Sequence, residues 1–445
     1  MGLTEFPKLR KVPVLESLIL SNNKLNGKVP NWLHEIDSLH AVNLAQNSLT
    51  TPVDQFSRNY QLRYLDLSYN LLTAGISSSI CNASSLQALV LSNNKLTGTI
   101  PQCLASSSFL SILSLEMNRL NGTLPNTFSK NSLTTLNLND NRLEGPLPES
   151  LSNCMQLELL NLGNNQIEDT FPHWLRTLPY LKVLVLRANK LHGPIAIFKT
   201  KHGFPSLNIF DISSNNFSGP IPKDYMQSFE SMKNIVQDKV VGNPQHYYSP
   251  TTVTLKGRSV QFKNILTNFV IINLSGNKFE GEIPNVIGEL QAFIGLNLSH
   301  NRLSGPIPQS MKNLIKLESL DLSSNMLSGR IPTELVNMKF LEVLNLSYNN
   351  IVGEIPQRNQ ADSFLNDSYM GNLGLCGVPL SVKCREKHDD QPSPPSQTLW
   401  REDKFGFSWE AVDIGYGCGM VLGVVMVNFV FLIGKPALLV RMFGG

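Results

Sequence analysis

The apolar positions of residues 269–356 recur in a unit of 24 residues that occurs four times. In one unit, apolar residues stand at Leu317, Leu320 and Leu322, and Asn325 follows them. The alternation at Leu320 and Leu322 predicts a short strand whose leucines point inward while the residues between them face solvent. One unit cannot bury its leucines alone, so the pattern predicts a solenoid of stacked coils.

An asparagine follows each predicted strand. Its side chain has both a donor and an acceptor, so a buried row of asparagines can satisfy backbone groups of neighbouring coils. Gly329 and Pro332 suit a close turn and a return path outside the strand ladder. The expected rungs are Asn23, Asn47, Asn70, Asn94, Asn118, Asn141, Asn165, Asn189, Asn215, Asn277, Asn301, Asn325 and Asn349.

The repeat divides into two blocks, nine coils in residues 15–222 and four coils in residues 269–356. The period and leucine spacing are those of a leucine-rich repeat, which predicts an α/β-type solenoid, a horseshoe or superhelix of parallel strands. The coils begin at Leu15, Leu39, Leu62, Leu86, Leu110, Leu133, Leu157, Leu181, Leu207, Phe269, Phe293, Leu317 and Leu341.

Residues 1–14 have the pattern of the end of a coil whose strand is absent, with apolar Leu3 and Phe6 before Pro7. We interpret the chain as the C-terminal part of a longer one, because a solenoid normally closes its first coil with a cap. A genuine short isoform is the alternative.

An insertion at residues 223–268 separates the two blocks. The run from Val253 to Leu255 favours a strand, and Gly242 to Pro244 favours a turn. A long insertion in a regular array is more often functional than decorative, so we expect a partly ordered island. A disordered loop is the alternative.

The period ends after Pro356. We predict a terminal cap at residues 357–384, closed by a disulfide between Cys376 and Cys384, which implies an oxidising compartment. Residues 385–404 are rich in proline and charged residues, which predicts a solvated stalk without a core, and we assign residues 385–413 to this stalk.

Residues 414–433 contain no charged side chain. As a helix they would span ~30 Å, the thickness of bilayer hydrocarbon, so we predict one transmembrane helix. Lys435 and Arg441 follow it, and a basic flank marks the cytoplasmic end, which places the repeats outside the cell. The tail, residues 434–445, is too short to form a kinase domain.

Three glycines, Gly415, Gly419 and Gly423, stand four residues apart in this segment. They fall on one helix face and would let a second helix approach closely. Asn428 is a polar residue in the same span that needs a partner. Glycine is common in membrane helices, so the spacing could also carry no function.

The remaining cysteines and the net charge allow three further predictions. Cys81 and Cys103 are 22 residues apart, close to one repeat, so they could form a disulfide or remain two buried thiols. Cys154 has no counterpart and is expected in the core. The net charge of +3 with 16% charged residues gives no indication of nucleic-acid binding.

Catalytic motifs are not found. The eight histidines show no metal-ligand spacing, and the sequence contains no nucleophile elbow or phosphate loop. The acids that face outward, such as Asp66, Asp211 and Asp321, are solitary, so no carboxylate pair can be argued. We therefore expect no enzyme activity, no cofactor and no metal.

A curved array offers an extended binding surface. We therefore expect ligand contacts at outward positions where the residue differs from the usual Asn or Ser of the repeat. These candidates are Arg63, Tyr64, Glu116, Met117, Lys182 and Arg187. Seven glycosylation acceptor sequences are also present, at Asn82, Asn121, Asn216, Asn273, Asn297, Asn345 and Asn366.

The complete pattern resembles plant leucine-rich-repeat receptor-like proteins, the class that includes disease-resistance receptors. The resemblance covers practically the whole chain. It is carried by LTGTIP (96–101), LSGPIP (303–308), VTLKG (253–257), NLSGNKFEGEIP (273–284) and GNLGLCGVPL (371–380).

The resemblance implies a type I plasma-membrane glycoprotein that recognises a microbial or endogenous ligand outside the cell in plant defence. It implies signalling through an adaptor receptor kinase bound by the membrane helix, and through a co-receptor kinase bound by the island and the last repeats. Tyr247, Lys256 and Gly257 match the family's island motif. Phe262 stands where many members have a tyrosine that contacts the co-receptor.

Three other functions stay open. The same architecture serves developmental peptide co-receptors. Leucine-rich repeats also form inhibitors of cell-wall-degrading enzymes, although the membrane segment and the island argue against that function. A non-functional truncated product is the third alternative.

Overall fold

The computed structural model describes most of the repeat array. The described residues are 2–7, 14–50, 53, 56, 61–129, 132–195, 203–233, 251–255, 258–262, 269–336, 338–357 and 364–384. The chain forms two compact units, Met1–Arg385 and Glu386–Gly445, and the second unit lies outside the described residues.

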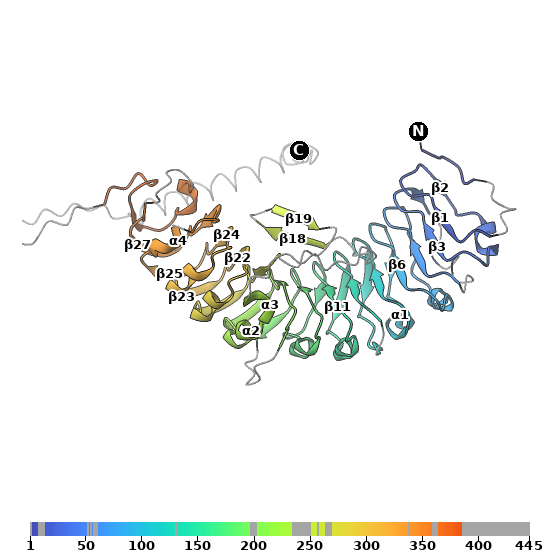
Figure 1. Cartoon of the computed structure of the whole chain (residues 1–445), viewed down its shortest axis with the longest axis horizontal. Coiled ribbons are helices and arrows are strands. Elements are labelled where there is room, and N and C mark those ends of the chain that lie inside the picture. Colours follow the sequence, from blue (N-terminus) through green and yellow to red (C-terminus); the bar gives the residue numbers. More distant parts are fainter. Residues whose placement is uncertain are drawn as a thin grey trace, which may run out of the picture. The chain divides into compact units, whose positions relative to one another are not determined.

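Thirteen parallel strands form one sheet in chain order, and each coil contributes one strand (Figure 1). The register is constant; for example, Leu184 of one coil stands opposite Leu160 and Phe210 of its neighbours. The predicted leucine-rich-repeat solenoid is therefore confirmed. The strands are β1 Ser17–Ile19, β3 Ala41–Asn43, β5 Tyr64–Asp66, β6 Ala88–Val90, β8 Ile112–Ser114, β10 Thr135–Asn137, β12 Leu159–Asn161, β14 Val183–Val185, β16 Ile209–Asp211, β20 Ile271–Asn273, β22 Gly295–Asn297, β24 Ser319–Asp321 and β26 Val343–Asn345.

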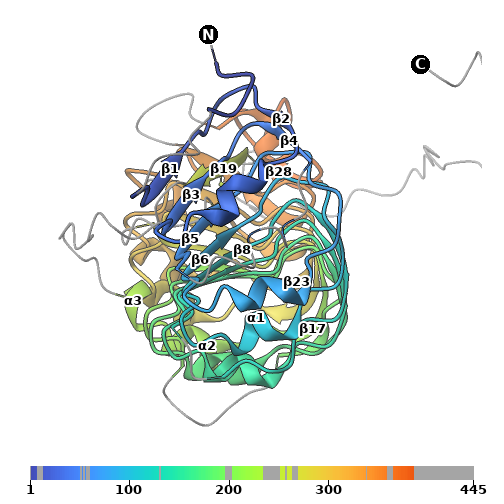
Figure 2. The same ribbon diagram turned by 90° about the vertical axis from the view of Figure 1, so that its right-hand side faces the viewer.

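The return path of the coils carries short strands on a second side. Two-stranded, four-stranded and seven-stranded parallel sheets run along it. Figure 2 looks along the array and shows β17 and β23 on the side away from β1, β3 and β5. These strands are β2 Asn26–Gly27, β4 Ser48–Leu49, β7 Thr97–Gly98, β9 Arg119–Gly122, β11 Arg142–Gly145, β13 Gln166–Ile167, β15 His192–Pro194, β17 Asn216–Pro220, β21 Lys278–Glu282, β23 Arg302–Pro306, β25 Met326–Gly329, β27 Asn350–Glu354 and β28 Gly374–Cys376.

Short helices complete the coils. Most begin directly after a proline that follows an apolar residue, because the fixed φ of proline suits the residue before a helix. The α-helices are α1 Gln102–Ser106, α2 Lys223–Ser228, α3 Glu230–Lys233 and α4 Thr333–Val336. The 3-10 helices are η1 Asn31–Glu35, η3 Ser78–Asn82, η4 Glu149–Asn153, η5 His173–Thr177, η6 Asn285–Glu289, η7 Gln309–Asn313 and η8 Asn366–Ser368.

The predicted asparagine ladder is confirmed at all thirteen positions. Asn325 is representative: its Nδ2 donates to the carbonyls of Leu322 and Ser323 at 3.1 Å and of Leu298 in the preceding coil at 3.0 Å. Its Oδ1 accepts from the backbone N–H of Leu303, also in the preceding coil, at 3.0 Å. Each rung therefore satisfies backbone groups of two coils.

The ladder extends one rung beyond the sequence prediction. Asn372, within the expected cap, donates to the carbonyls of Leu346 and Tyr369 and accepts from the N–H of Ile351. β28 then pairs with β27, so the cap begins by continuing the coil geometry. At the other end, Leu3 donates its N–H to Asn23 and accepts from the N–H of Lys24, as the preceding coil would.

Both expected disulfides are present. Cys81 of η3 is bonded to Cys103 of α1 on the return path of adjacent coils, with Cα atoms 6.2 Å apart. Cys376 is bonded to Cys384 in the cap. Cys154 is buried in the core and is not disulfide-bonded, as predicted.

The first part of the expected insertion belongs to the solenoid. Tyr225 and Met226 of α2, and Met232 of α3, are buried in the core. Tyr225 packs 5.4 Å from Phe171 by ring centroids, and burial raises the pKa of its hydroxyl to about 12. In the sequence, residues 223–233 show no helical pattern that would have assigned them to the solenoid instead of the island.

The island itself contains a β-hairpin. β18 Thr251–Leu255 pairs antiparallel with β19 Arg258–Phe262, with Val253 opposite Val260. The strand expected at Val253–Leu255 is therefore confirmed.

Within the described residues, no helix has the length and apolar character needed to cross a bilayer. The expected membrane segment, 414–433, and the expected stalk, 385–413, lie outside these residues.

Candidate ligand-binding surface

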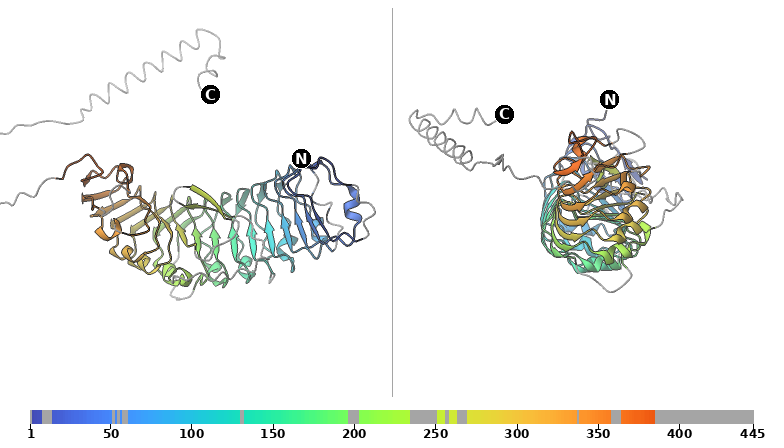
Figure 3. Two further views of the ribbon diagram at one scale, coloured as in Figure 1. Left: turned by 45° about the horizontal axis from the view of Figure 1, so that its top comes forward. Right: turned by 90° about the vertical axis from the view of Figure 1, so that its left-hand side faces the viewer.

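We call the side of the thirteen-stranded sheet that faces away from the leucine core the outer sheet face. It is formed by the first and third residues of each strand, because successive residues of a strand point to opposite sides. The strands lie side by side along the array (Figure 3). The six predicted ligand contacts lie in or directly beside β5, β8 and β14.

At β5, the structure holds Tyr64 in place through Asp66. The Tyr64 hydroxyl donates to Asp66 Oδ2 at 3.1 Å. The other carboxylate oxygen accepts from the N–H and Oγ–H of Ser68, at 2.9 Å and 2.7 Å. Arg63 directly precedes the strand and is exposed. This coil therefore presents an oriented phenol next to an exposed cation.

At β8, the two predicted residues have different environments. Glu116 is buried, with an exposed fraction of 6%, whereas Met117 is 50% exposed. Met117 has a φ of 55°, in the left-handed region, as do residues at the same position of other coils, including Tyr69 and Tyr348. The exposure expected of an outward contact is therefore found for Met117 and not for Glu116; the equivalent Ser68 and Ser92 of other coils are buried as well.

At β14, Lys182 forms an ion pair that the sequence analysis missed. Its Nζ lies 2.9 Å from Glu158 Oε2 in the preceding coil, and both side chains are partly buried. The two residues are 24 positions apart, one repeat, so they occupy the same place in adjacent coils. This 24-residue spacing is the feature of the sequence from which the ion pair could have been predicted.

Arg187 lies across the neighbouring coil. A Cβ added to Gly163 would stand 3.2 Å from Arg187 Cγ and 2.7 Å from Asn139 Oδ1, so a side chain at Gly163 would collide with this arrangement. Gly163 and Arg187 both replace the serine that most coils have at this position. The glycine thus allows the arginine stem to lie flat on the sheet.

Asp211, the third residue of β16, is fully buried near Arg187. Burial raises the pKa of its carboxyl above the ordinary value of 3.8, while the hydrogen bonds of Ser213 and the charge of Arg187 oppose the shift. Ser213 Oγ–H donates to Asp211 Oδ1 at 2.6 Å. The sequence showed a solitary acid here and gave no sign of its burial.

The six predicted contacts do not form one pocket. In sheet order, β6 separates β5 from β8, and β10 and β12 separate β8 from β14. With strands about 4.8 Å apart, the contacts sample a span of roughly 25 Å along the array. The geometry suits an extended ligand rather than a compact one.

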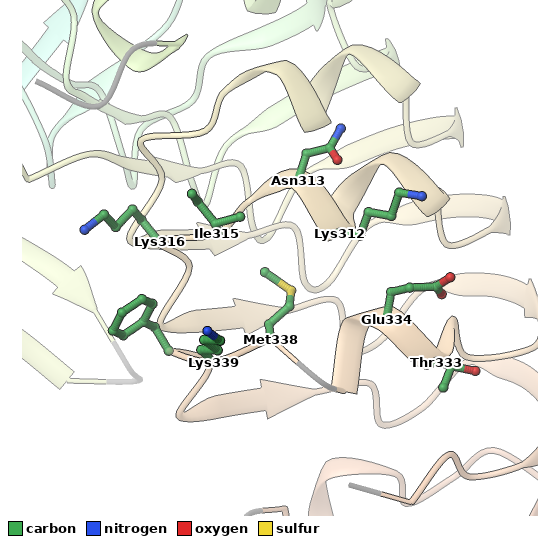
Figure 4. Close-up of a pocket in the computed structure, with 9 residues that line it drawn as sticks. Lys312, Asn313, Ile315, Lys316, Thr333, Glu334, Met338 and Lys339 are labelled. Carbon is green, nitrogen blue, oxygen red and sulfur yellow. The ribbon is translucent and has the colours of Figure 1, made fainter. Parts of the chain in front are cut away.

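A groove on the last coils is a second candidate surface (Figure 4). It has a volume of about 770 Å³ and is lined by Lys312, Asn313, Ile315, Lys316, Thr333, Glu334, Met338, Lys339 and Phe340. Ile315 and Phe340 are each 53% exposed. The ammonium of Lys316 lies 5.6 Å from the Phe340 ring centroid, a cation–π distance. An apolar contact framed by three lysines suits a protein partner.

The sequence matches the description "Leucine Rich Repeat" in residues 14–36, 61–83, 85–107 and 268–290, and a second "Leucine rich repeat" description in residues 131–191 and 295–351. It is 45% identical to Receptor like protein 27 of Arabidopsis thaliana over the whole chain, and 47% identical to Receptor-like protein 48 of the same plant over 96% of the chain. The chain belongs to the plant leucine-rich-repeat receptor-like proteins. It spans 58% and 54% of the lengths of those two relatives.

Solved structures similar to this chain include plant receptors bound to peptide hormones. The Arabidopsis receptor kinase HAESA, in complex with the peptide hormone IDA and the co-receptor SERK1, has a TM-score of 0.60 and 29% identity, covering 85% of this chain and 65% of HAESA. The plant peptide hormone receptor RGFR1, in complex with RGF2, has a TM-score of 0.55 and 25% identity, covering 78% of this chain and 61% of RGFR1.

The glycosylation acceptors of this receptor-like protein have different environments. Four of them are exposed: Asn82, Asn121, Asn216 and Asn366. Asn297 and Asn345 are half-buried, and Asn273 is buried. Asn273 Oδ1 accepts from Ser275, and its Nδ2 donates to Ser213 Oγ at 3.2 Å. A glycan on that nitrogen would compete with a buried hydrogen bond, which the sequence motif could not indicate.

A metal site was not expected, and the described residues contain no group of three or more His, Cys, Asp or Glu side chains that could hold an ion. The remaining candidates lie outside the described residues: Tyr247, Lys256 and Gly257 of the island, and Gly415, Gly419 and Gly423 of the expected membrane helix. Only the backbone of Phe262 is described, at the end of β19.

Proposed function

We propose that this receptor-like protein is a plasma-membrane receptor subunit that binds an extracellular peptide or protein along its outer sheet face. The observation that carries the proposal is the set of fixed polar and charged groups on separate coils of one sheet face, from Tyr64 and Asp66 at β5 to Lys182 and Arg187 at β14. They are spaced by whole coils, and an extended ligand can contact several coils at once. The peptide complexes of HAESA and RGFR1 favour a peptide as the ligand class.

The direct test changes the charge of the outer sheet face. Arg63→Glu and Lys182→Glu should each reduce ligand-triggered signalling of the full chain at least tenfold. Each replaces a positive charge that would attract an acidic group of the ligand with a negative charge that would repel it. Lys95→Glu is the matched control, because Lys95 is exposed outside the strands of this sheet. Extracts of microbial and of plant origin serve as probes. An unchanged dose response in both Glu variants would argue against this surface.

We propose that the signal leaves through a partner kinase bound by the expected membrane helix. Gly415, Gly419 and Gly423 would provide its contact face. Replacing all three with leucine should abolish co-purification of an adaptor receptor kinase from plant membranes. Gly417→Leu, on a different side of the same helix, should leave recovery unchanged. Equal recovery from both variants would contradict the helix contact.

The co-receptor is expected at the island and the last coils. The groove containing Ile315 and Phe340 supports this place, because exposed apolar side chains next to cations suit a protein contact. Phe262→Tyr restores the hydroxyl of the family's island motif and should increase ligand-dependent recovery of a co-receptor kinase. Phe340→Ser should lower it.

Two other functions have separate tests. A developmental role predicts a response to endogenous plant peptides and not to microbial extracts, the reverse of a defence role. An inhibitor of cell-wall-degrading enzymes predicts that residues 1–384 reduce polygalacturonase activity at equimolar concentration. A longer transcript encoding further coils would indicate that the present chain is a truncated product.

A further inference from the structure

A second apolar cluster lies on the outer sheet face, separate from the leucine core. It consists of Leu159, Val183, Val185, Ile209 and Ile271, with Phe269 packed against it. All five have exposed fractions between 0% and 3%, although they stand at strand positions that point away from the core. We call these five residues the apolar row.

The apolar row is continuous across four strands. Leu159 stands opposite Val183, Val183 opposite Ile209, and Ile209 opposite Ile271. Other coils have Ser17, Gly295 or Ser319 at the equivalent first position of the strand. Removing four or five aliphatic side chains from water is favourable, so this row is suited to bind an apolar surface.

The apolar row is located where the island joins the solenoid. Ile209 and Ile271 are direct neighbours in the sheet but 62 residues apart in sequence. The chain returns from the island at Phe269, two residues before Ile271, and Phe269 packs against the row. The segment that follows α3 and precedes Phe269 is therefore tethered beside it.

The island carries a complementary element. Directly opposed residues of an antiparallel hairpin lie on the same face, so the β18–β19 register places the pairs Thr251–Phe262, Val253–Val260 and Leu255–Arg258 on one face, which is apolar except for Thr251 and Arg258. The other face receives the pairs Thr252–Gln261 and Thr254–Ser259. An isolated two-stranded hairpin is at best marginally stable in water, so this hairpin needs a surface for its apolar face.

We propose that the apolar row is an intramolecular docking surface for the β18–β19 hairpin. The row anchors the island on the outer sheet face at β12, β14, β16 and β20. The polar face of the hairpin is then turned toward external partners. This inference does not depend on the proposed receptor function, because it concerns one contact within the chain.

The test measures hydrogen exchange of the hairpin amides in the full chain. Val183→Asp places a charge in the apolar row, and we expect about tenfold faster exchange in residues 251–255 and 258–262, because the hairpin opens locally when its docking surface is lost. Val343→Asp is the matched control, since Val343 occupies the same coil position in β26 outside the row. It should leave hairpin exchange unchanged. Equal exchange in both variants would overturn the proposal.

A reciprocal measurement covers the case in which Val183→Asp does not fold. Val183→Cys introduces a thiol into the row, and its rate of alkylation reports whether the row is covered. Adding Val253→Asp, on the apolar face of the hairpin, should increase that rate about tenfold. Adding Thr254→Asp, on the polar face, should not. The same rate in both double variants would contradict docking by this hairpin.

Discussion

At the scale of single residues, the rung asparagines use almost all of their hydrogen-bonding capacity. Asn349 donates to the carbonyls of Leu322, Leu346 and Ser347 and accepts from the N–H of Leu327. Aspartate cannot donate and alanine can do neither, so no other small side chain reproduces these contacts. The sequence motif was therefore sufficient to predict the ladder.

Asn349→Ala should lower the free energy of unfolding of residues 1–384 by about 1–3 kcal/mol, because it leaves buried backbone groups unpaired. Asn350→Ala is the matched control, since the adjacent Asn350 is exposed. Its effect should stay within about 0.5 kcal/mol. Denaturant titration monitored by circular dichroism measures both. Equal effects would show that the rung contacts contribute nothing specific.

The buried carboxyl of Asp211 predicts a pH dependence. Because its pKa in the folded state lies above 3.8, the folded state binds this proton more readily than the unfolded state. Its contribution to stability therefore improves as pH falls through the folded-state pKa toward 3.8, and worsens as pH rises through it.

Asp211→Asn retains an oxygen that can accept from Ser213 and removes the charge. The melting temperature of the variant minus that of the wild type should become more positive as the pH rises from 4 to 7. Thermal unfolding across this range measures the difference. A difference that falls with rising pH would contradict a raised pKa.

At the scale of elements, the strands were predictable because each depends on its own six-residue leucine pattern. Leu320 and Leu322 determine which face of β24 points inward, independently of the rest of the chain. The candidate contacts depend on pairs from different coils, such as Lys182 with Glu158 and Arg187 with Gly163. Only their matching places in the repeat relate these residues, so the period predicts that they are neighbours but not what they do.

The disulfide between η3 and α1 provides a test at this scale. Removing it with the double substitution Cys81→Ser and Cys103→Ser opens a loop of 22 residues and should cost about 3.4 kcal/mol by the loop-entropy relation. Cys376→Ser with Cys384→Ser opens a loop of 8 residues and should cost slightly less, about 2.5 kcal/mol. Denaturant midpoints of both variants test the order.

At the scale of the whole molecule, the solenoid explains why contacts can be spread over many coils without a central pocket. Each coil touches only its neighbours, so stability accumulates coil by coil. The island was the least predictable part, because its packing depends on the apolar row. Val183 and Val185 also fit an ordinary strand, and nothing in their local sequence distinguishes a covered outer face from the core.

The expected membrane segment can be tested by detergent partitioning. The full chain should enter the detergent phase, because residues 414–433 form an uncharged, mainly apolar segment long enough to span it. A chain ending at Cys384 should stay in the aqueous phase. If both forms remain aqueous, residues 414–433 do not anchor the protein.

The rung geometry also sets rules for recombination. From Asn47 at one end to Asn372 at the other, every rung asparagine contacts the coil before it through the same two atoms, Oδ1 and Nδ2. Blocks of whole coils from two relatives present identical seams when cut at equivalent rungs. Chimeras joined in phase should fold as readily as their parents, so the recognition range of one relative can be grafted onto the signalling end of another.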